Sequence, residues 1–381
     1  AAPPPPPPPA GPPPPPPAET GPVSGGNLRL ALSDGSSAEV LDPQGFISAT
    51  DQYRTLNIWD RLAEVEADNT ISLRLAESIE PASEGDATVW VVRLKSGITF
   101  HDGKDLSADD VLWTFQRLLR EEAPYFSAVD PFVDGSRLRK IDDLTVEFGL
   151  KQPYGDFRRF LSNRYTHILR DGTDSFTSAQ ECVGTGPFSL QEWTPGERAV
   201  LAKNPSWWSS GQPYLDTIEL LQIAPESQLN ALLAGQVDSV EGVAFSSLAQ
   251  ALELEGNPEV QLFRLPGSNV QNLTMRLDSK PFDAPNVRLA FRLAFDRQTL
   301  LDTLYLGQGS LGNDLHGKAF PSYNSVLPQR EYDPEQARAL LAEAGYPDGI
   351  EVELVTGLYP EQAQVYAAQA KAAGIDIKLK K

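Results

Sequence analysis

Helices with clear start signals alternate with short apolar strands along this chain, and this alternation most constrains its fold. At the clearest start, Ser107 occupies the N-cap position and Asp110 the N3 position. Asp109 and Asp110 also place negative charge near the positive end of the helix dipole, and residues 111–119 carry an apolar face. The sequence therefore predicts a helix that begins directly after Ser107.

A second helix start lies near the end of the chain. Asp333-Pro334-Glu335-Gln336 combines an Asp cap, a proline at the first helical position and a glutamine at N3, and Gly345 is expected to stop the helix. A turn over residues 346–349 then leads into an apolar strand at 350–355. Further strands are predicted at residues 28–32, 88–94, 144–150, 199–202 and 217–223. Helix, turn and strand alternate as in a mixed α/β protein.

Length and charge narrow the classes of function. A chain of 381 residues is long enough for two or three domains with substantial cores. It contains no run of about 18 apolar residues, the length needed to cross a bilayer. The formal net charge of -20 disfavours nucleic acid as a partner, because phosphate binding needs clustered Lys and Arg. The charge fits either solubility or selection of a cationic cargo.

Cysteine and histidine are too sparse for a metal centre. A single cysteine, Cys182, excludes an internal disulfide and a cysteine-cluster metal site, and we expect it to be a small buried residue. His101, His167 and His316 are scattered without metal-ligand spacing. We therefore expect neither a metal site nor a cofactor.

Residues 1–22 are almost wholly Pro, Ala and Gly. This composition favours extended polyproline II segments and cannot bury enough apolar surface to fold. We interpret the segment as a disordered tether, and any targeting peptide as removed or absent. It would suit a receptor that a lipid anchor holds near a membrane, although no anchoring cysteine is visible here; a ligand for an SH3-type domain is the competing interpretation.

Several motifs occur in an order typical of one family. They are residues 94–111, the segment Val183-Gly184-Thr185-Gly186-Pro187-Phe188 with 192–196 and 204–208 after it, residues 232–238, residues 281–297, and the capped helix at 332–345. In this order they resemble family 5 of the bacterial solute-binding proteins, which serve peptide and nickel ABC importers. The resemblance runs from about residue 28 to residue 379, and the glycines of the 183–188 segment are expected to permit tight turns.

The resemblance implies an α/β fold of the periplasmic-binding-protein type II class, a two-lobe flytrap with an extra inserted domain. It would place residues 23–65 and 183–270 in lobe I, 66–182 in the inserted domain and 271–381 in lobe II. Family members usually continue beyond this point, so we expect lobe II to be incomplete.

The resemblance also implies a function without catalysis. Such proteins capture a peptide or similar small solute between two lobes, and the closed form delivers it to a membrane permease. Closure requires that the ligand bind the closed state more tightly than the open state. We expect a monomer located outside the cytoplasm, in the periplasm or on the outer face of the cytoplasmic membrane.

Ligand contacts vary within this family, so the candidate residues are chosen by region. The loop after Asp42-Pro43, the inserted domain and the segment beyond it are expected to approach the ligand. The candidates are Phe46, Thr50, Tyr53, Tyr125, Phe126, Arg164, Tyr165 and His167. Aromatic residues of this kind more often pack in the core or against loops, and an exposed arginine such as Arg164 more often forms a surface ion pair. His101, in an Asp-Gly turn, is expected to be structural, and Arg288 to form a local or interlobe hydrogen bond.

Two other classes of function stay open. An enzyme would need positioned catalytic groups, and the chain has no Gly-x-Ser-x-Gly elbow, Walker loop or His-Glu-x-x-His motif. A binding or scaffolding protein on the same fold would use the Pro-rich segment to recruit its partner.

Overall fold

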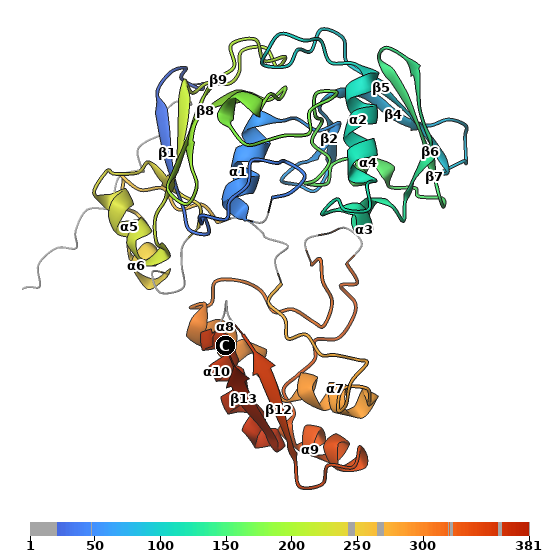
Figure 1. The fold of residues 1–381 in the computed structure, drawn as a ribbon. Helices are drawn as coiled ribbons and strands as arrows, with labels where there is room; N and C mark the ends of the chain where they lie inside the picture. The colour runs from blue at the N-terminus through green and yellow to red at the C-terminus, as the bar shows by residue number, and fades with distance from the viewer. Residues whose placement is uncertain are drawn as a thin grey trace, which may run out of the picture. The chain divides into compact units, whose positions relative to one another are not determined.

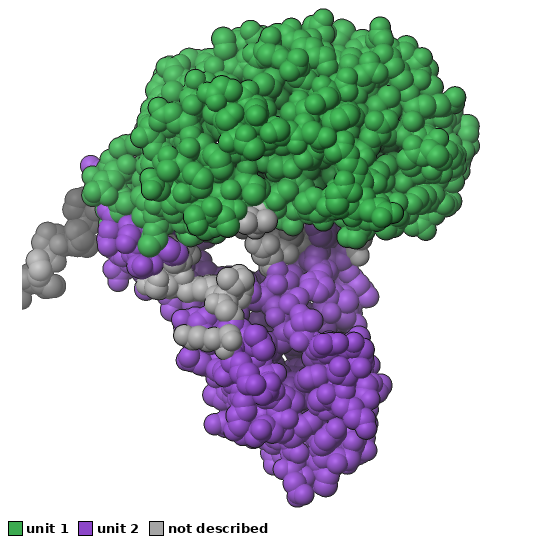
Figure 2. Space-filling model, in the orientation of Figure 1, with its two compact units in different colours: residues 1–224, 231–241 green, residues 225–230, 242–381 purple. Residues whose placement is uncertain are grey.

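The computed structural model describes residues 21–46, 48–242, 248–264, 270–318, 320, 323–356 and 360–380. They form two compact units, which Figure 2 colours separately. Unit 1 contains residues 1–224 and 231–241, and unit 2 contains residues 225–230 and 242–381. Helix α5 (Pro225–Leu233) contributes residues to both. Most of the predicted tether, residues 1–20, lies outside the described residues.

The first sheet of unit 1 combines parallel and antiparallel strands in the order β11-β1-β10-β9-β8. Strand β1 (Asn27–Leu32) runs parallel to both β10 (Thr217–Gln222) and β11 (Ser239–Val240), whereas β9 (Arg198–Lys203) pairs antiparallel with β10 and β8 (Phe188–Thr194). The strands predicted at 28–32, 199–202 and 217–223 are thereby confirmed. Alternate residues of these strands are buried with Trp59 in one apolar core.

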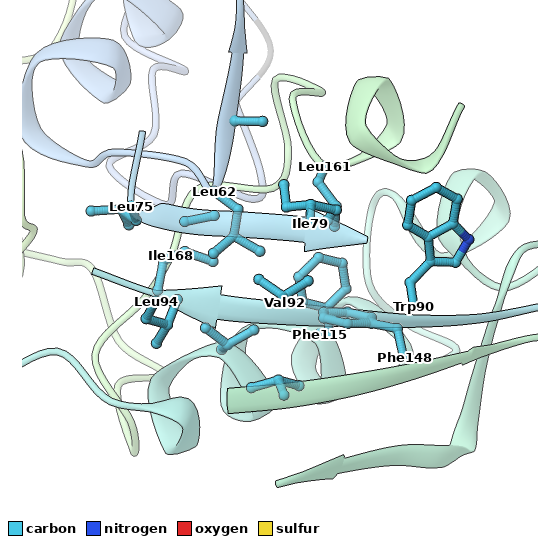
Figure 3. Packing of buried hydrophobic residues seen from close by; sticks show 14 of the residues in the cluster. Leu62, Leu75, Ile79, Trp90, Val92, Leu94, Phe115, Phe148, Leu161 and Ile168 are labelled. Carbon is cyan, nitrogen blue, oxygen red and sulfur yellow. The ribbon is translucent and has the colours of Figure 1, made fainter. Parts of the chain in front are cut away.

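The second sheet of unit 1 is antiparallel, in the order β4-β5-β7-β6. Its strands are β4 (Ala76–Pro81), β5 (Val89–Leu94), β6 (Val133–Asp142) and β7 (Thr145–Leu150), so the strands predicted at 88–94 and 144–150 are confirmed. Helix α2 (Ala108–Leu118) packs on this sheet (Figure 1). Figure 3 shows Ile79, Val92 and Phe115 pointing into the shared core, where Phe115 meets Phe148 edge to face at 4.9 Å.

Helix α2 begins where the sequence predicts. The Asp110 carboxylate accepts hydrogen bonds from the Ser107 backbone N–H at 2.8 Å and from the Ser107 hydroxyl at 2.9 Å. Lys104 donates to the same carboxylate at 2.6 Å. These contacts fix the path of the chain into the helix.

Short elements complete unit 1. They are α1 (Ala49–Ile58), β2 (Ala63–Val65), β3 (Ile71–Leu73), α3 (Phe126–Val129), α4 (Phe157–Phe160) and η1 (Ala179–Glu181). Strands β2 and β3 pair antiparallel.

Unit 2 has its own apolar core. Its elements are α6 (Leu248–Glu253), α7 (Pro285–Leu293), α8 (Arg297–Leu304), α9 (Pro334–Glu343), β12 (Ile350–Val355), α10 (Pro360–Ala370), η3 (Lys371–Ala373) and β13 (Ile375–Lys380). Strands β12 and β13 pair in parallel, and α7, α9 and α10 share a buried cluster with β13. The Asp333 side chain accepts from the Gln336 N–H at 2.8 Å, which confirms the predicted cap, and the strand at 350–355 is also confirmed.

The architecture is therefore mixed α/β, as predicted. The proposed division into lobes and an inserted domain at residues 65, 182 and 270 remains a prediction. Of the helices in the described ranges, none combines the length and apolar character that a bilayer span requires.

Candidate functional site

Two carboxylates follow parallel strands of the first sheet and lie near the start of α1. Asp34 follows β1 and Glu241 follows β11. Asp34 accepts hydrogen bonds from the Thr50 backbone N–H at 3.0 Å and from the Thr50 hydroxyl at 2.6 Å. In open α/β sheets, ligands bind outside the carboxyl ends of parallel strands. This acidic edge is therefore a candidate place for a polar solute.

The acidic edge perturbs its own ionisable groups. The surrounding protein removes part of the solvent from the Glu241 carboxylate and raises its pKa, and the negative charge of Asp34 raises it further. Burial also raises the pKa of Tyr53, with smaller contributions from Glu241 and Asp34. Thr50 thus lies beside this acidic edge through its hydrogen bonds to Asp34. Tyr53 lies close enough to feel the charges of both carboxylates.

Four of the predicted residues come together as an aromatic platform, which we define as Phe46, Tyr125, Tyr165 and Arg164. Tyr125 stacks on Tyr165 with ring centroids 4.9 Å apart and lies 5.6 Å from the Phe46 ring. Its hydroxyl donates to the Phe46 carbonyl at 3.3 Å. The Arg164 guanidinium lies over the Phe46 ring, 5.2 Å from its centroid. Residues more than 100 positions apart in the sequence therefore build one surface.

Phe126 and His167 do not join the platform. Phe126 is half-buried and begins α3. His167 is 0% exposed, and its ring nitrogens form no hydrogen bond of good geometry among the described residues, although the Arg164 backbone is near enough to oppose the fall of its pKa. Burial, followed by the positive charge of Arg61, lowers the pKa of His167 well below its usual value. In this conformation the His167 side chain has no route to a solute.

A buried polar cluster around Asp60 is absent from the sequence-based candidates. Asp60 is 7% exposed and accepts from the indole N–H groups of Trp208 at 2.8 Å and Trp207 at 3.3 Å, and from the Thr185 hydroxyl at 3.2 Å. Burial raises its pKa, against the effect of these hydrogen bonds. Lys95 lies 4.6 Å from the Trp208 ring centroid. The only sequence signal was the tryptophan pair in the 204–208 motif.

The glycines of the 183–188 segment serve close packing, which differs from the predicted role in tight turns. Neither Gly184 nor Gly186 has a left-handed φ, but a Cβ on Gly184 would lie 1.9 Å from the Ile58 carbonyl oxygen. His101 holds the same segment: its Nδ1 accepts from the Gly184 N–H at 3.3 Å, and its Nε2 donates to the Gly186 carbonyl at 3.0 Å. Its predicted structural role is consistent with these contacts.

The remaining residues singled out in the sequence are structural. Cys182 is buried as predicted, and burial raises the pKa of its thiol to about 12, which keeps it protonated and unreactive. Arg288 donates to the carbonyls of Phe282 at 2.7 Å and Asp283 at 3.0 Å, a local interaction. Within the described ranges, no three His, Cys, Asp or Glu side chains converge as a metal site.

Comparison with known proteins gives a consistent result. The profile of the family described as "Bacterial extracellular solute-binding proteins, family 5 Middle" matches residues 70–381. A dipeptide-binding protein of Escherichia coli strain K12 is 28% identical over 345 residues, which cover 84% of this chain and 63% of that protein. A glutathione-binding protein of the same strain is 27% identical over 355 residues, covering 92% of this chain and 68% of that protein.

A solved structure shares the fold. The periplasmic binding protein DppA from Helicobacter pylori, in complex with the peptide STSA, is 24% identical and has a TM-score of 0.78. The match covers 94% of this chain and 74% of that chain. The chain thus spans less than two thirds of the dipeptide-binding relative and about three quarters of this structure.

Proposed function

This chain belongs to family 5 of the bacterial extracellular solute-binding proteins, and we propose that it is the substrate-binding component of an ABC importer. In this role it captures a peptide or similar small solute between two lobes and delivers it to a membrane permease. The observation that carries the proposal is the family match over residues 70–381. The relatives named for dipeptide and glutathione binding support small peptides as the class of solute.

The structure offers two surfaces for such a solute within unit 1. The acidic edge of Asp34 and Glu241 suits a positively charged group, and the aromatic platform supplies the half-buried rings of Tyr125 and Tyr165 with one arginine. Charge-assisted hydrogen bonds of this kind orient a ligand, whereas apolar contact supplies much of the affinity. We assign Thr50 and Tyr53 to the first surface; Phe126 and His167 remain predictions without a contact that supports them.

The location and partners follow from the same proposal. The protein acts outside the cytoplasm, as a monomer, and a lipid anchor would hold it beside its permease. It performs no catalysis, so a solute leaves it chemically unchanged. The family and its relatives are binding proteins, which supports this part of the proposal.

Equilibrium dialysis against a panel of di- and tripeptides, glutathione and nickel–histidine chelate tests the proposal. We expect saturable binding of one solute class at one molecule per chain, with every panel member recovered intact. Hydrolysis or any other conversion of a panel member would contradict the binding role. If no panel member binds in a saturable manner, the result argues against peptides and chelates as the class of solute.

A further inference from the structure

We propose that Arg74 and Lys95 form a second binding site in unit 1, which takes a small oxyanion of the phosphate type. The proposal goes beyond the proposed function, because the site shares no residue with the acidic edge or the aromatic platform. Its ligand is an inorganic anion and not the solute.

The two cations lie over one aromatic ring. The Lys95 Nζ is 4.6 Å from the Trp208 ring centroid, and the Arg74 guanidinium is 5.7 Å from it. In the described part of the chain, every other ring in a cation–π contact carries a single cation. Trp208 therefore brings two like charges close together, which an isolated unpaired arginine does not do.

The two cations repel each other where water screens them only in part. Arg74 and Lys95 are both half-buried. Burial, followed by the positive charge of Arg74, lowers the pKa of Lys95, while Asp60 acts in the opposite direction. Repulsion between like charges is stronger near a protein surface than in bulk water. An anion in contact with both cations would relieve this repulsion.

Both cations have donors left for a ligand. The Arg74 side chain forms no hydrogen bond or ion pair with any residue that the structure describes, and its Nε is buried. The Lys95 ammonium donates to the Leu73 carbonyl at 3.3 Å. An ammonium group has three donors, so others stay available. The same contact holds Lys95 beside the residue that precedes Arg74.

The neighbouring carboxylates are engaged elsewhere. Asp60 accepts hydrogen bonds from the indole N–H groups of Trp207 and Trp208. Glu64 is paired with Arg61. Neither carboxylate forms an ion pair with the two cations over Trp208, so a counter-charge from outside the chain has a place to bind.

The combination of a guanidinium and an ammonium group favours a tetrahedral oxyanion. A guanidinium binds two oxygens of one anion side by side, whereas an ammonium group acts as a compact charge that needs an oxygen of its own. A carboxylate has only two oxygens, and the guanidinium would occupy both. Phosphate and sulfate have four oxygens that point in different directions. Such an ion can contact both cations at once.

The site joins the two larger sheets of unit 1. Arg74 lies between β3 and β4, Lys95 follows β5, and Trp208 follows β9. The indole of Trp208 is held by its hydrogen bond to Asp60 at 2.8 Å, so the ring that supports the cations is already ordered. Ordered groups lose less conformational entropy on binding. A bound anion would connect these loops and stabilise unit 1.

The test follows the Nε–H signal of Arg74 in protein labelled with ¹⁵N-arginine while inorganic phosphate is added at constant ionic strength. The signal is assigned by its disappearance in Arg74→Lys. Arg93 is the matched control, because it lies in β5 two residues before Lys95, is exposed, and forms no cation–π contact within the described ranges. Its signal is assigned with Arg93→Lys, and sodium chloride replaces phosphate in a parallel titration.

We expect phosphate to shift the Arg74 signal in a saturable manner, while chloride leaves it unchanged and Arg93 responds to neither salt. In Lys95→Met the phosphate affinity at Arg74 should fall by about tenfold or more, because one charge-assisted contact is lost. Lys95→Arg keeps the charge and should retain binding. No saturable shift at Arg74, the same shift at Arg93, or an unchanged affinity in Lys95→Met would overturn the proposal.

A second measurement compares the thermal unfolding midpoints of wild-type protein and Arg74→Gln in phosphate and in chloride of equal ionic strength. A ligand that binds only the folded state raises the midpoint. Phosphate also stabilises proteins in general, because it is excluded from their surface, and this effect is common to both proteins. We expect a larger rise for wild-type protein, and equal rises would contradict the site. Neither measurement involves a solute, so failure of the dialysis panel would leave both results valid.

Discussion

At the scale of single residues, breaking one buried ion-pair network is expected to destabilise unit 1 strongly. Arg54 is 2% exposed and is paired with Glu39 at 2.6 Å and with Asp51, and it lies 5.6 Å from the Trp193 ring centroid. Arg54→Met would leave the buried Glu39 carboxylate without its cation. Breaking a buried pair in this way typically costs about 3–5 kcal/mol. Denaturant unfolding of unit 1, followed by tryptophan fluorescence, measures the loss.

The matched control for Arg54 is an exposed pair in the same unit. Arg139 and Glu147 are 2.7 Å apart, but the Arg139 side chain is 64% exposed. Solvent screens such a pair, so Arg139→Met is expected to change the free energy of unfolding very little. If both variants lose the same stability, burial is not what makes the Arg54 network important.

A second residue-scale prediction concerns pH. The pKa of His167 is lowered by burial, so the folded protein favours the neutral ring and the unfolded chain binds the proton more readily. The contribution of His167 is therefore complete above the unfolded pKa of about 6.5 and is lost as the pH falls below it. The slope from one such group is at most about 1.4 kcal/mol per pH unit.

The variant His167→Gln isolates this contribution. The free energy of unfolding is measured for wild-type and variant protein at several pH values below 7. We expect the wild-type protein to lose stability more steeply than the variant. Parallel curves would show that protonation of His167 is not coupled to unfolding.

At the scale of elements, the 183–188 segment is expected to tolerate no side chain at Gly184. In Gly184→Ala the new Cβ would meet the Ile58 carbonyl oxygen at 1.9 Å and the Trp59 Cδ1 at 2.8 Å, and a backbone atom cannot move aside easily. We expect a loss of about 3 kcal/mol or more in thermal or denaturant unfolding. Gly155→Ala is the control, because no atom lies within 4 Å of its added Cβ and its φ is not left-handed. Equal stability of the two variants would disprove the close-packing role.

Local sequence signals predict where helices and strands begin better than they predict which strands pair with each other. The start of α2 at Ser107 and that of α9 at Asp333 depend on side chains within three residues, so the sequence alone identifies them. The pairing of β1 with β10 joins residues 190 positions apart, and local patterns contain no information about it. The parallel order of β11, β1 and β10 was therefore not predicted.

The same limit applies to the candidate site. Phe46, Tyr125, Arg164 and Tyr165 were chosen by region, and the structure brings them together through contacts that no local pattern shows. The Asp60 cluster was missed because Asp60 lies 125 positions from Thr185 and 147 from Trp207 along the chain. His167 was chosen in the same way, and its complete burial is a further property that local patterns do not show.

At the scale of the whole molecule, each unit has a buried core of its own. The two larger sheets of unit 1 have separate apolar clusters, and unit 2 holds the cluster around α7, α9 and β13. Independent cores allow parts of a chain to act as separate bodies, which a binding protein that closes on its solute requires. The proposed function depends on that behaviour.

The central claim is that the protein binds a solute and releases it unchanged. The most direct measurement is mass spectrometry of the full-length protein as purified, under native and then denaturing conditions. We predict a native mass that exceeds the mass of the denatured chain by that of one small solute, which denaturation releases intact. A protein that carries no solute, and to which the expected solutes add no mass under native conditions, would contradict the account.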